Sequence, residues 1–155
     1  MKEAGTKRGV YCAATAGEET TKTARTYGWN CKAGLAVVVD VTYCTDYPYG
    51  YSVKEAGEVK LGAGPVLCNS PLIPSQLNRQ AEKIAARRGI PVQYETASRL
   101  TCTDADKIHF ENGGTPVILV SIPLRYMHSP AEVADEGDVE GCIGLVAGIL
   151  EEFEL

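Results

Sequence analysis

The chain has 155 residues, of which 45% are hydrophobic and 23% charged, and its formal net charge is -5. A chain of this length forms one domain with a core of its own. Its acidic balance argues against nucleic acid or a membrane surface as a partner. No apolar run reaches the ~20 residues of a membrane span. The first residues also lack the apolar core of a secretory signal, so we expect a cytoplasmic protein.

The first half of the chain contains one clear buried strand. Residues 6–18 are rich in alanine and predict a helix, and the polar residues 20–29 predict a loop. Residues 33–42 are mostly apolar and include three consecutive valines, which indicates a central strand. That strand ends close to Asp40, a carboxylate that is costly to bury unless it is paired or binds a cation.

Residues 43–51 form a loop because Pro48 and Gly50 interrupt them. The loop carries four tyrosines, which could line a pocket, form an interface or cover a sheet edge. Residues 60–65 form a glycine-rich turn that lacks the spacing of a phosphate-binding loop. A short strand follows at residues 65–68.

The second half alternates helices and strands. The patterns predict helices at residues 75–88, 104–110 and 139–153, the last with Asp138 as its N-cap, and strands at residues 90–94 and 117–121. This alternation is typical of an α/β protein, a three-layer α/β/α sandwich with a mostly parallel or mixed sheet.

The cysteines give no sign of a zinc ribbon or a redox motif. They stand at positions 12, 31, 44, 68, 102 and 142, and none forms a Cys-x-x-Cys pair. Several lie in apolar surroundings, so we expect them to be free and to serve as small buried apolar residues.

Asp40 and His128 are the residues that point to chemistry. His128 is one of two histidines and follows the apolar strand that begins at Val117. Open α/β sheets bind their ligands beyond the carboxyl ends of their strands. Asp40 and His128, placed at or just past strand ends, therefore suggest a metal site, although His128 could also simply cap its loop.

Several blocks of the sequence occur in the order found in a known family. They are Val39-Asp-Val-Thr42 with Thr45-Asp46, Leu61-Gly-Ala-Gly-Pro65, Thr103-Asp-Ala105, and Ser121-Ile-Pro-Leu-Arg-Tyr-Met-His-Ser-Pro130 with Glu132-Val133. With them the chain resembles the glutamyl and leucyl aminopeptidases also called cellulase M, the forty-second metallopeptidase family. The resemblance extends from Glu3 to the last helix.

The resemblance implies a zinc-aminopeptidase-like fold and a two-metal site that holds zinc or cobalt. Residue by residue, it implies that His128 binds one metal, that Asp40 binds the other, and that Glu3 is a further ligand. It also implies a peptide substrate, cleaved at its N-terminal residue, and a homo-oligomer.

The departures from the family matter as well. Lys2 stands where the family has its general base, so no catalytic residue can be assigned there. Tyr43 stands where many members have histidine. The family's N-terminal histidine ligand, its metal-bridging aspartate and its inserted dimerisation domain have no counterpart. We therefore expect residues 1–155 to correspond to a C-terminal portion of the catalytic domain, with impaired activity on its own.

Three functions compete on these grounds. The first is a metal-dependent aminopeptidase present as a fragment. The second is a non-catalytic remnant or partner subunit. The third is a glucan hydrolase, for which Asp40 with Asp104 or Asp46 could be the carboxylate pair.

Overall fold

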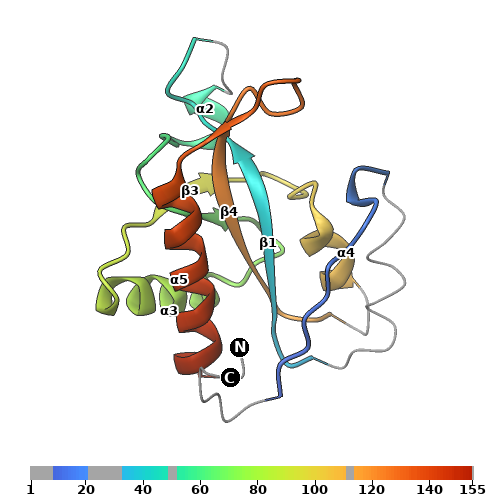
Figure 1. Ribbon diagram of the computed structural model, residues 1–155. Helices are drawn as coiled ribbons and strands as arrows, with labels where there is room; N and C mark the ends of the chain where they lie inside the picture. The colour runs from blue at the N-terminus through green and yellow to red at the C-terminus, as the bar shows by residue number, and fades with distance from the viewer. Residues whose placement is uncertain (1–8, 21–32, 49–51, 111–113, 155) are drawn as a thin grey trace.

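The computed structural model describes residues 9–20, 33–48, 52–110 and 114–154, and these contain five strands with helices before, between and after them (Figure 1). In chain order the elements are the 3-10 helix η1 (Glu18–Thr20), β1 (Ala36–Tyr43), α2 (Val53–Ala56), β2 (Val66–Asn69), α3 (Ser75–Arg87), β3 (Gln93–Thr96), α4 (Asp104–Phe110), β4 (Val117–Arg125), β5 (Val133–Ala134) and α5 (Glu136–Glu152).

The strands form one mixed sheet in the order β1-β4-β2-β3, and β5 pairs with β4. β1 runs parallel to β4 over its whole length, and β2 runs parallel to β3. The two parallel pairs meet where β2 and β4 run antiparallel, over only two residue pairs. The expectation of a mostly parallel or mixed sheet is therefore confirmed.

Helices cover both faces of this sheet. α3 and α5 lie on one face, and α4 lies on the other (Figure 1). Leu145 and Ile149 of α5 and Ile84 of α3 pack with Ile118 and Val120 of β4 in the main core. The neighbouring residues of β4, Val117 and Leu119, point the other way and pack with Val38 and Ala105. This alternation of side chains along the strand produces three layers, as the sequence predicts.

β1 and β4 both extend further than the apolar pattern predicts. β1 continues to Tyr43, so Asp40 lies inside the strand and not at its end. β4 continues past Ser121 through Pro123 to Arg125. Pro123 is tolerated because it lies between the last pair with β2 and the first pair with β5, where its missing N–H is not needed.

α3 has nearly the predicted limits. Ala81, Ile84 and Ala85 are buried on one face, and Gly89, with φ of 67°, follows the end of the helix. Arg88 forms ion pairs with acidic residues at the C-terminal end of α5. The arginines at the end of α3 therefore join two helices.

α5 begins earlier than predicted. Its N-cap is Asp135, whose carboxylate accepts the N–H of Gly137, and not Asp138. Asp138 lies in the first turn and is 1% exposed. Two acidic residues lie close together here, and the sequence pattern does not distinguish the cap from the buried one. No helix within the described ranges is long and apolar enough to cross a membrane.

The expected helix at residues 6–18 is wrong for the part that the structure describes. Residues 9–17 are irregular, and their side chains are exposed. A short helix needs a packed apolar face to be stable in water, and no side chain of residues 9–17 is in the buried class. Most of the expected loop, residues 21–29, lies outside the described residues. α2, a single helical turn, was not predicted.

The cysteines follow the expectation in part. Cys44, Cys68 and Cys142 are buried and form no disulfide, whereas Cys12 and Cys102 are exposed, and Cys31 lies outside the described residues. Burial raises the pKa of Cys68 to about 12, so its thiol behaves as a small apolar group.

Candidate metal centre

Parallel pairing of β1 and β4 brings the two predicted metal ligands to the same region of the sheet. Asp40 lies opposite Ser121 in the register of these strands. His128 follows the end of β4 by three residues. Because the strands are parallel, β4 ends on the same side of the sheet as β1, whose last residues run from Asp40 to Tyr43.

His128 lies in a loop whose backbone is unusual. Tyr126 and His128 have φ of 62° and 63°, in the left-handed region. Each costs about 1–3 kcal/mol for a residue with a side chain. The loop is held by bonds that offset this cost: Tyr126 N–H donates to Tyr47 Oη at 3.2 Å, and His128 N–H donates to Glu132 Oε1 at 2.6 Å.

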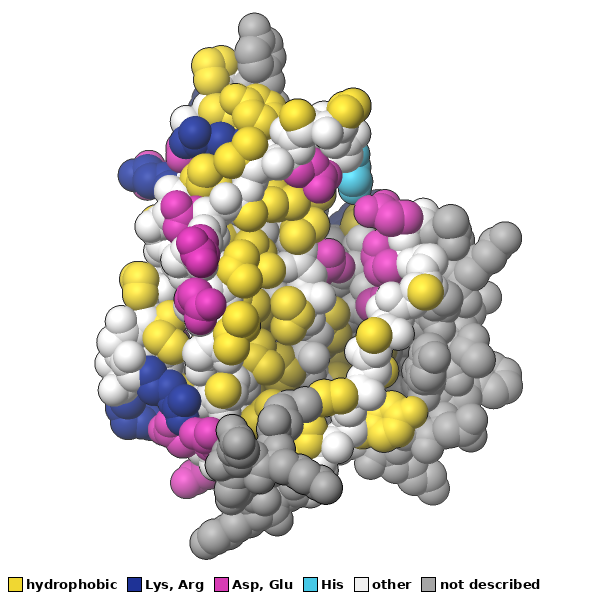
Figure 2. All heavy atoms as spheres, in the orientation of Figure 1, with side chains coloured by type: hydrophobic (Ala, Val, Ile, Leu, Met, Phe, Trp, Pro, Cys, Tyr) yellow, Lys and Arg dark blue, Asp and Glu magenta, His cyan; other side chains and the backbone are white. Residues whose placement is uncertain are grey.

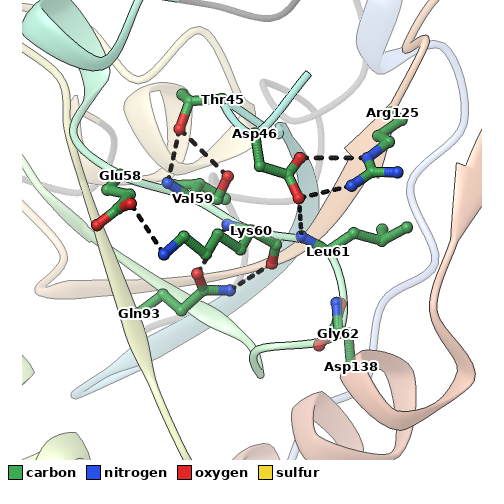
Figure 3. Close-up of polar contacts among 10 residues, drawn as sticks. All are labelled: Thr45, Asp46, Glu58, Val59, Lys60, Leu61, Gly62, Gln93, Arg125 and Asp138. Atoms are coloured by element: carbon green, nitrogen blue, oxygen red, sulfur yellow. Dashed lines mark hydrogen bonds and ion pairs between the residues drawn. The ribbon is translucent and has the colours of Figure 1, made fainter.

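The base of this loop is fixed by an ion pair between β4 and the segment after β1 (Figure 3). Arg125 binds Asp46 through two nitrogens, with Nη2–Oδ2 at 2.6 Å and Nε–Oδ1 at 3.2 Å. Asp46 Oδ2 also accepts the N–H of Leu61 at 3.3 Å. The hydrogen bonds from Arg125 hold the pKa of Asp46 below its usual value, so the pair stays charged.

The imidazole of His128 has a partner on each nitrogen. Nδ1 lies 3.3 Å from Tyr43 Oη, and Nε2 lies 3.1 Å from Glu19 Oε1. The rings of Tyr43 and His128 meet edge to face, with centroids 6.2 Å apart. Tyr43 therefore orients the imidazole through its hydroxyl.

Asp40 lies near other negatively charged side chains. Its Oδ1 accepts the N–H of Val41 at 2.8 Å. Partial burial raises the pKa of Asp40, and repulsion from Asp104 and Glu19 raises it further. Burial and repulsion from Asp40 likewise raise the pKa of Glu18. Such carboxylates, close together and weakly compensated, are what a site for a cation presents.

Charge and ligand type therefore suit a divalent metal, since zinc and cobalt bind carboxylate oxygen and imidazole nitrogen. Within the described ranges, however, no three His, Cys, Asp or Glu side chains are arranged to hold an ion. Asp40 and His128 supply two candidate ligands. Glu3, the third, and Lys2, at the general-base position, lie outside the described residues. All four assignments remain predictions.

An open hollow of about 630 Å³ lies beside His128. It is lined by Tyr43, Tyr47, Tyr126, Met127, Ser129, Ala131 and Val133. Two of the tyrosines from residues 43–51 thus line a pocket, one of the three options that the sequence leaves open. Tyr49 and Tyr51 lie outside the described residues. On the face drawn in Figure 2, a histidine lies beside acidic side chains at the border of a hydrophobic band.

Comparison with known proteins shows which family the chain resembles. Residues 1–145 match the M42 glutamyl aminopeptidase family. Lysyl aminopeptidase of Pyrococcus furiosus is 35% identical over 124 residues, 79% of this chain and 36% of that protein.

Two solved structures agree. A TET aminopeptidase from Thaumarchaeota archaeon SCGC AB-539-E09 superposes with a TM-score of 0.81 and 30% identity, over 92% of this chain and 40% of that one. The TET1 peptidase of Pyrococcus horikoshii can assemble into a tetrahedron or a large octahedral shell. It superposes with a TM-score of 0.66 and 25% identity, over 84% of this chain and 37% of that one. The chain thus spans at most 40% of these three relatives. With its fold and most of its sequence matched, the chain belongs to the M42 glutamyl aminopeptidase family.

Proposed function

We propose that this chain contributes to a metal-dependent aminopeptidase, which hydrolyses N-terminal residues from peptides. The observation that carries the proposal is the clamped loop that holds His128 at the end of β4, beside the parallel strand that carries Asp40. In this role His128 binds one metal ion and Asp40 binds the other, with Glu3 as a further ligand. Zinc or cobalt would supply a water of lowered pKa and polarise the scissile carbonyl.

The chain's own residues set limits on that activity. Lys2 carries an ammonium group, which has no acceptor for a proton from the attacking water. We propose that residues 1–155 correspond to a C-terminal portion of the relatives' catalytic domain without the inserted dimerisation domain, and that activity is impaired when it acts alone. Lys2 also favours the second candidate, a non-catalytic remnant or partner subunit.

The geometry disfavours a glucan hydrolase. Such an enzyme needs two available carboxylates on either side of the bond. Asp104 is 4% exposed and pairs with Lys107, and Asp46 is held by Arg125. Neither carboxylate is free to act with Asp40.

Aminoacyl-4-nitroanilide hydrolysis with added zinc or cobalt tests the proposal. We expect weak metal-dependent activity that falls at least about a hundredfold in His128→Ala, since even groups that only support a ligand cost 10–100-fold. His109→Ala removes the other histidine, which contacts the Thr115 carbonyl before the start of β4, whereas His128 follows the end of that strand, and this change should keep the activity. No hydrolysis by the wild type would favour the non-catalytic role, and hydrolysis of cellulose oligomers alone would favour the glucan hydrolase.

We also propose that the chain forms homo-oligomers in the cytoplasm. The three buried cysteines without disulfides suit a reducing compartment. A hydrophobic band runs along the face that α5 and β1 share (Figure 2), and Val39 of β1 and Ile143 of α5 are 50% and 58% exposed. Exposed apolar surface of this kind marks an interface.

Light scattering at increasing protein concentration measures this association. We expect the mass to rise above that of one chain. The paired change Val39→Lys and Ile143→Lys should lower it, because it places charge at exposed apolar positions of β1 and α5. Glu140→Lys changes an exposed position of α5 that is already charged, and it serves as the control. A constant monomer mass for the wild type would contradict the proposal.

A further inference from the structure

Glu95 is a partly buried carboxylate outside the candidate metal site. It lies on β3, the strand farthest from β1 in the sheet. Its side chain is nevertheless hydrogen-bonded by the hydroxyl of Thr42 on β1, and Ser121 Oγ on β4 donates to Oε1 at 3.4 Å. It stands next to Cys68 of β2 in the strand register. One carboxylate therefore connects all four main strands.

This carboxylate lies on the same face of the sheet as Asp40. Side chains alternate along a strand, so Asp40 and Thr42 share the face of Val38, which packs towards α4. Ser121, opposite Asp40 in register, shares that face with Leu119. Glu95 is thus held by Ser121, which pairs with Asp40 across the strands, and by Thr42, two residues after Asp40.

Within the described part of the chain, no lysine or arginine forms an ion pair with Glu95 or Asp40. Burial raises the pKa of Glu95, two hydroxyl hydrogen bonds act against that rise, and repulsion from Asp40 adds to it. Even a partly buried charge near a like charge is unfavourable in the absence of a cation. Glutamine in this place would meet the same two hydroxyls without that cost.

We propose that Glu95 is a positioning residue of the metal site: it aligns β1 through Thr42, and its charge favours a cation at Asp40, at the expense of the stability of the cation-free protein. The inference rests on the proposed metal site. In this role the charge of Glu95 lowers the stability of the cation-free protein and strengthens cation binding. A purely structural residue would not show these two opposite effects.

The experiment compares Glu95→Gln, Glu95→Asp and Glu140→Gln with the wild type. Chelator-treated protein is melted at fixed pH, and Co²⁺ alone is then titrated calorimetrically. We expect Glu95→Gln to melt about 3 °C higher without metal and to bind Co²⁺ about tenfold more weakly. Glu95→Asp keeps the charge but reaches the hydroxyls less well, so it should melt lower and bind Co²⁺ within about threefold of the wild type. Glu140→Gln removes an exposed charge and should change neither quantity.

The outcomes separate this inference from the proposed function. If the wild type binds Co²⁺ and Glu95→Gln binds it equally well, the role of Glu95 is overturned and the metal site stands. If Glu95→Gln lowers both melting temperature and affinity, Glu95 is a structural residue only, and the inference is again wrong. If the wild type and His128→Ala show the same absence of binding, the metal site itself fails and the inference fails with it.

Discussion

The Gly64→Ala substitution is expected to destabilise the protein by about 4 kcal/mol or more, which is exceptional for a single change. Gly64 has φ of +99°, a conformation that side chains rarely adopt. A Cβ atom there would lie 2.2 Å from the carbonyl oxygen of Pro91 and 2.9 Å from its carbonyl carbon. These are backbone atoms next to β3, so they cannot rotate away. Urea denaturation of the metal-free protein gives the free energy of unfolding.

Gly89→Ala is the matched control for this change. Gly89 also has a positive φ, +67°, but nothing lies within 4 Å of the position that a Cβ would occupy. Its substitution therefore measures the backbone cost alone, about 1–2 kcal/mol. If Gly64→Ala proves no more costly than Gly89→Ala, the close approach of the glycine-rich turn to Pro91 does not exist in solution.

The Asp138→Ala substitution should cost about 3 kcal/mol, because it leaves two backbone donors, one of them fully buried, without an acceptor. Asp138 Oδ2 accepts the N–H of Gly62 at 2.7 Å, and Oδ1 accepts the N–H of Gly64 at 2.6 Å (Figure 3 shows the first of these contacts). The carboxylate also lies in the first turn of α5, where the helix dipole favours negative charge. It joins the glycine-rich turn to the helix.

Two further variants separate these effects. Asp138→Asn keeps one acceptor oxygen and should lose about half as much stability as Asp138→Ala. Asp135→Ala removes the N-cap bond to Gly137 and should cost about 1 kcal/mol. The same denaturation measurement applies. Equal losses for Asp138→Ala and Asp135→Ala would mean that Asp138 acts only as a second cap.

Helices whose ends are marked by nearby residues, such as a capping aspartate or a glycine, could be predicted from the sequence. α4 has the predicted limits, Asp104–Phe110, and α3 ends one residue before the predicted limit, ahead of Gly89. The end of β4 could not be predicted in this way. Pro123 looks like a strand terminator, and only its place between two different partner strands makes it harmless.

For the candidate site, too, some residues could be predicted from the sequence and others could not. The ordered blocks around Asp40 and His128 single out these residues, and the structure brings their strands together. The contacts that hold these strands and their loop in place could not be inferred, because the residues that form each contact are distant in sequence. Arg125 with Asp46, and Glu95 with Thr42, meet only when the sheet forms. Arg125 lies within the family block, and that is the only signal that could have pointed to it.

The sheet's two parallel pairs differ in how far apart along the chain their strands lie, which suggests an order of folding. β2 and β3 are joined through α3 alone, so they can form from local contacts. β1 pairs with β4 from Ala36 to Val117, and this closes a loop over about half of the chain. Contacts that span long loops form more slowly than local ones. We expect the unit from β2 to β3 to form first, and the strands that carry the candidate metal ligands to join it late.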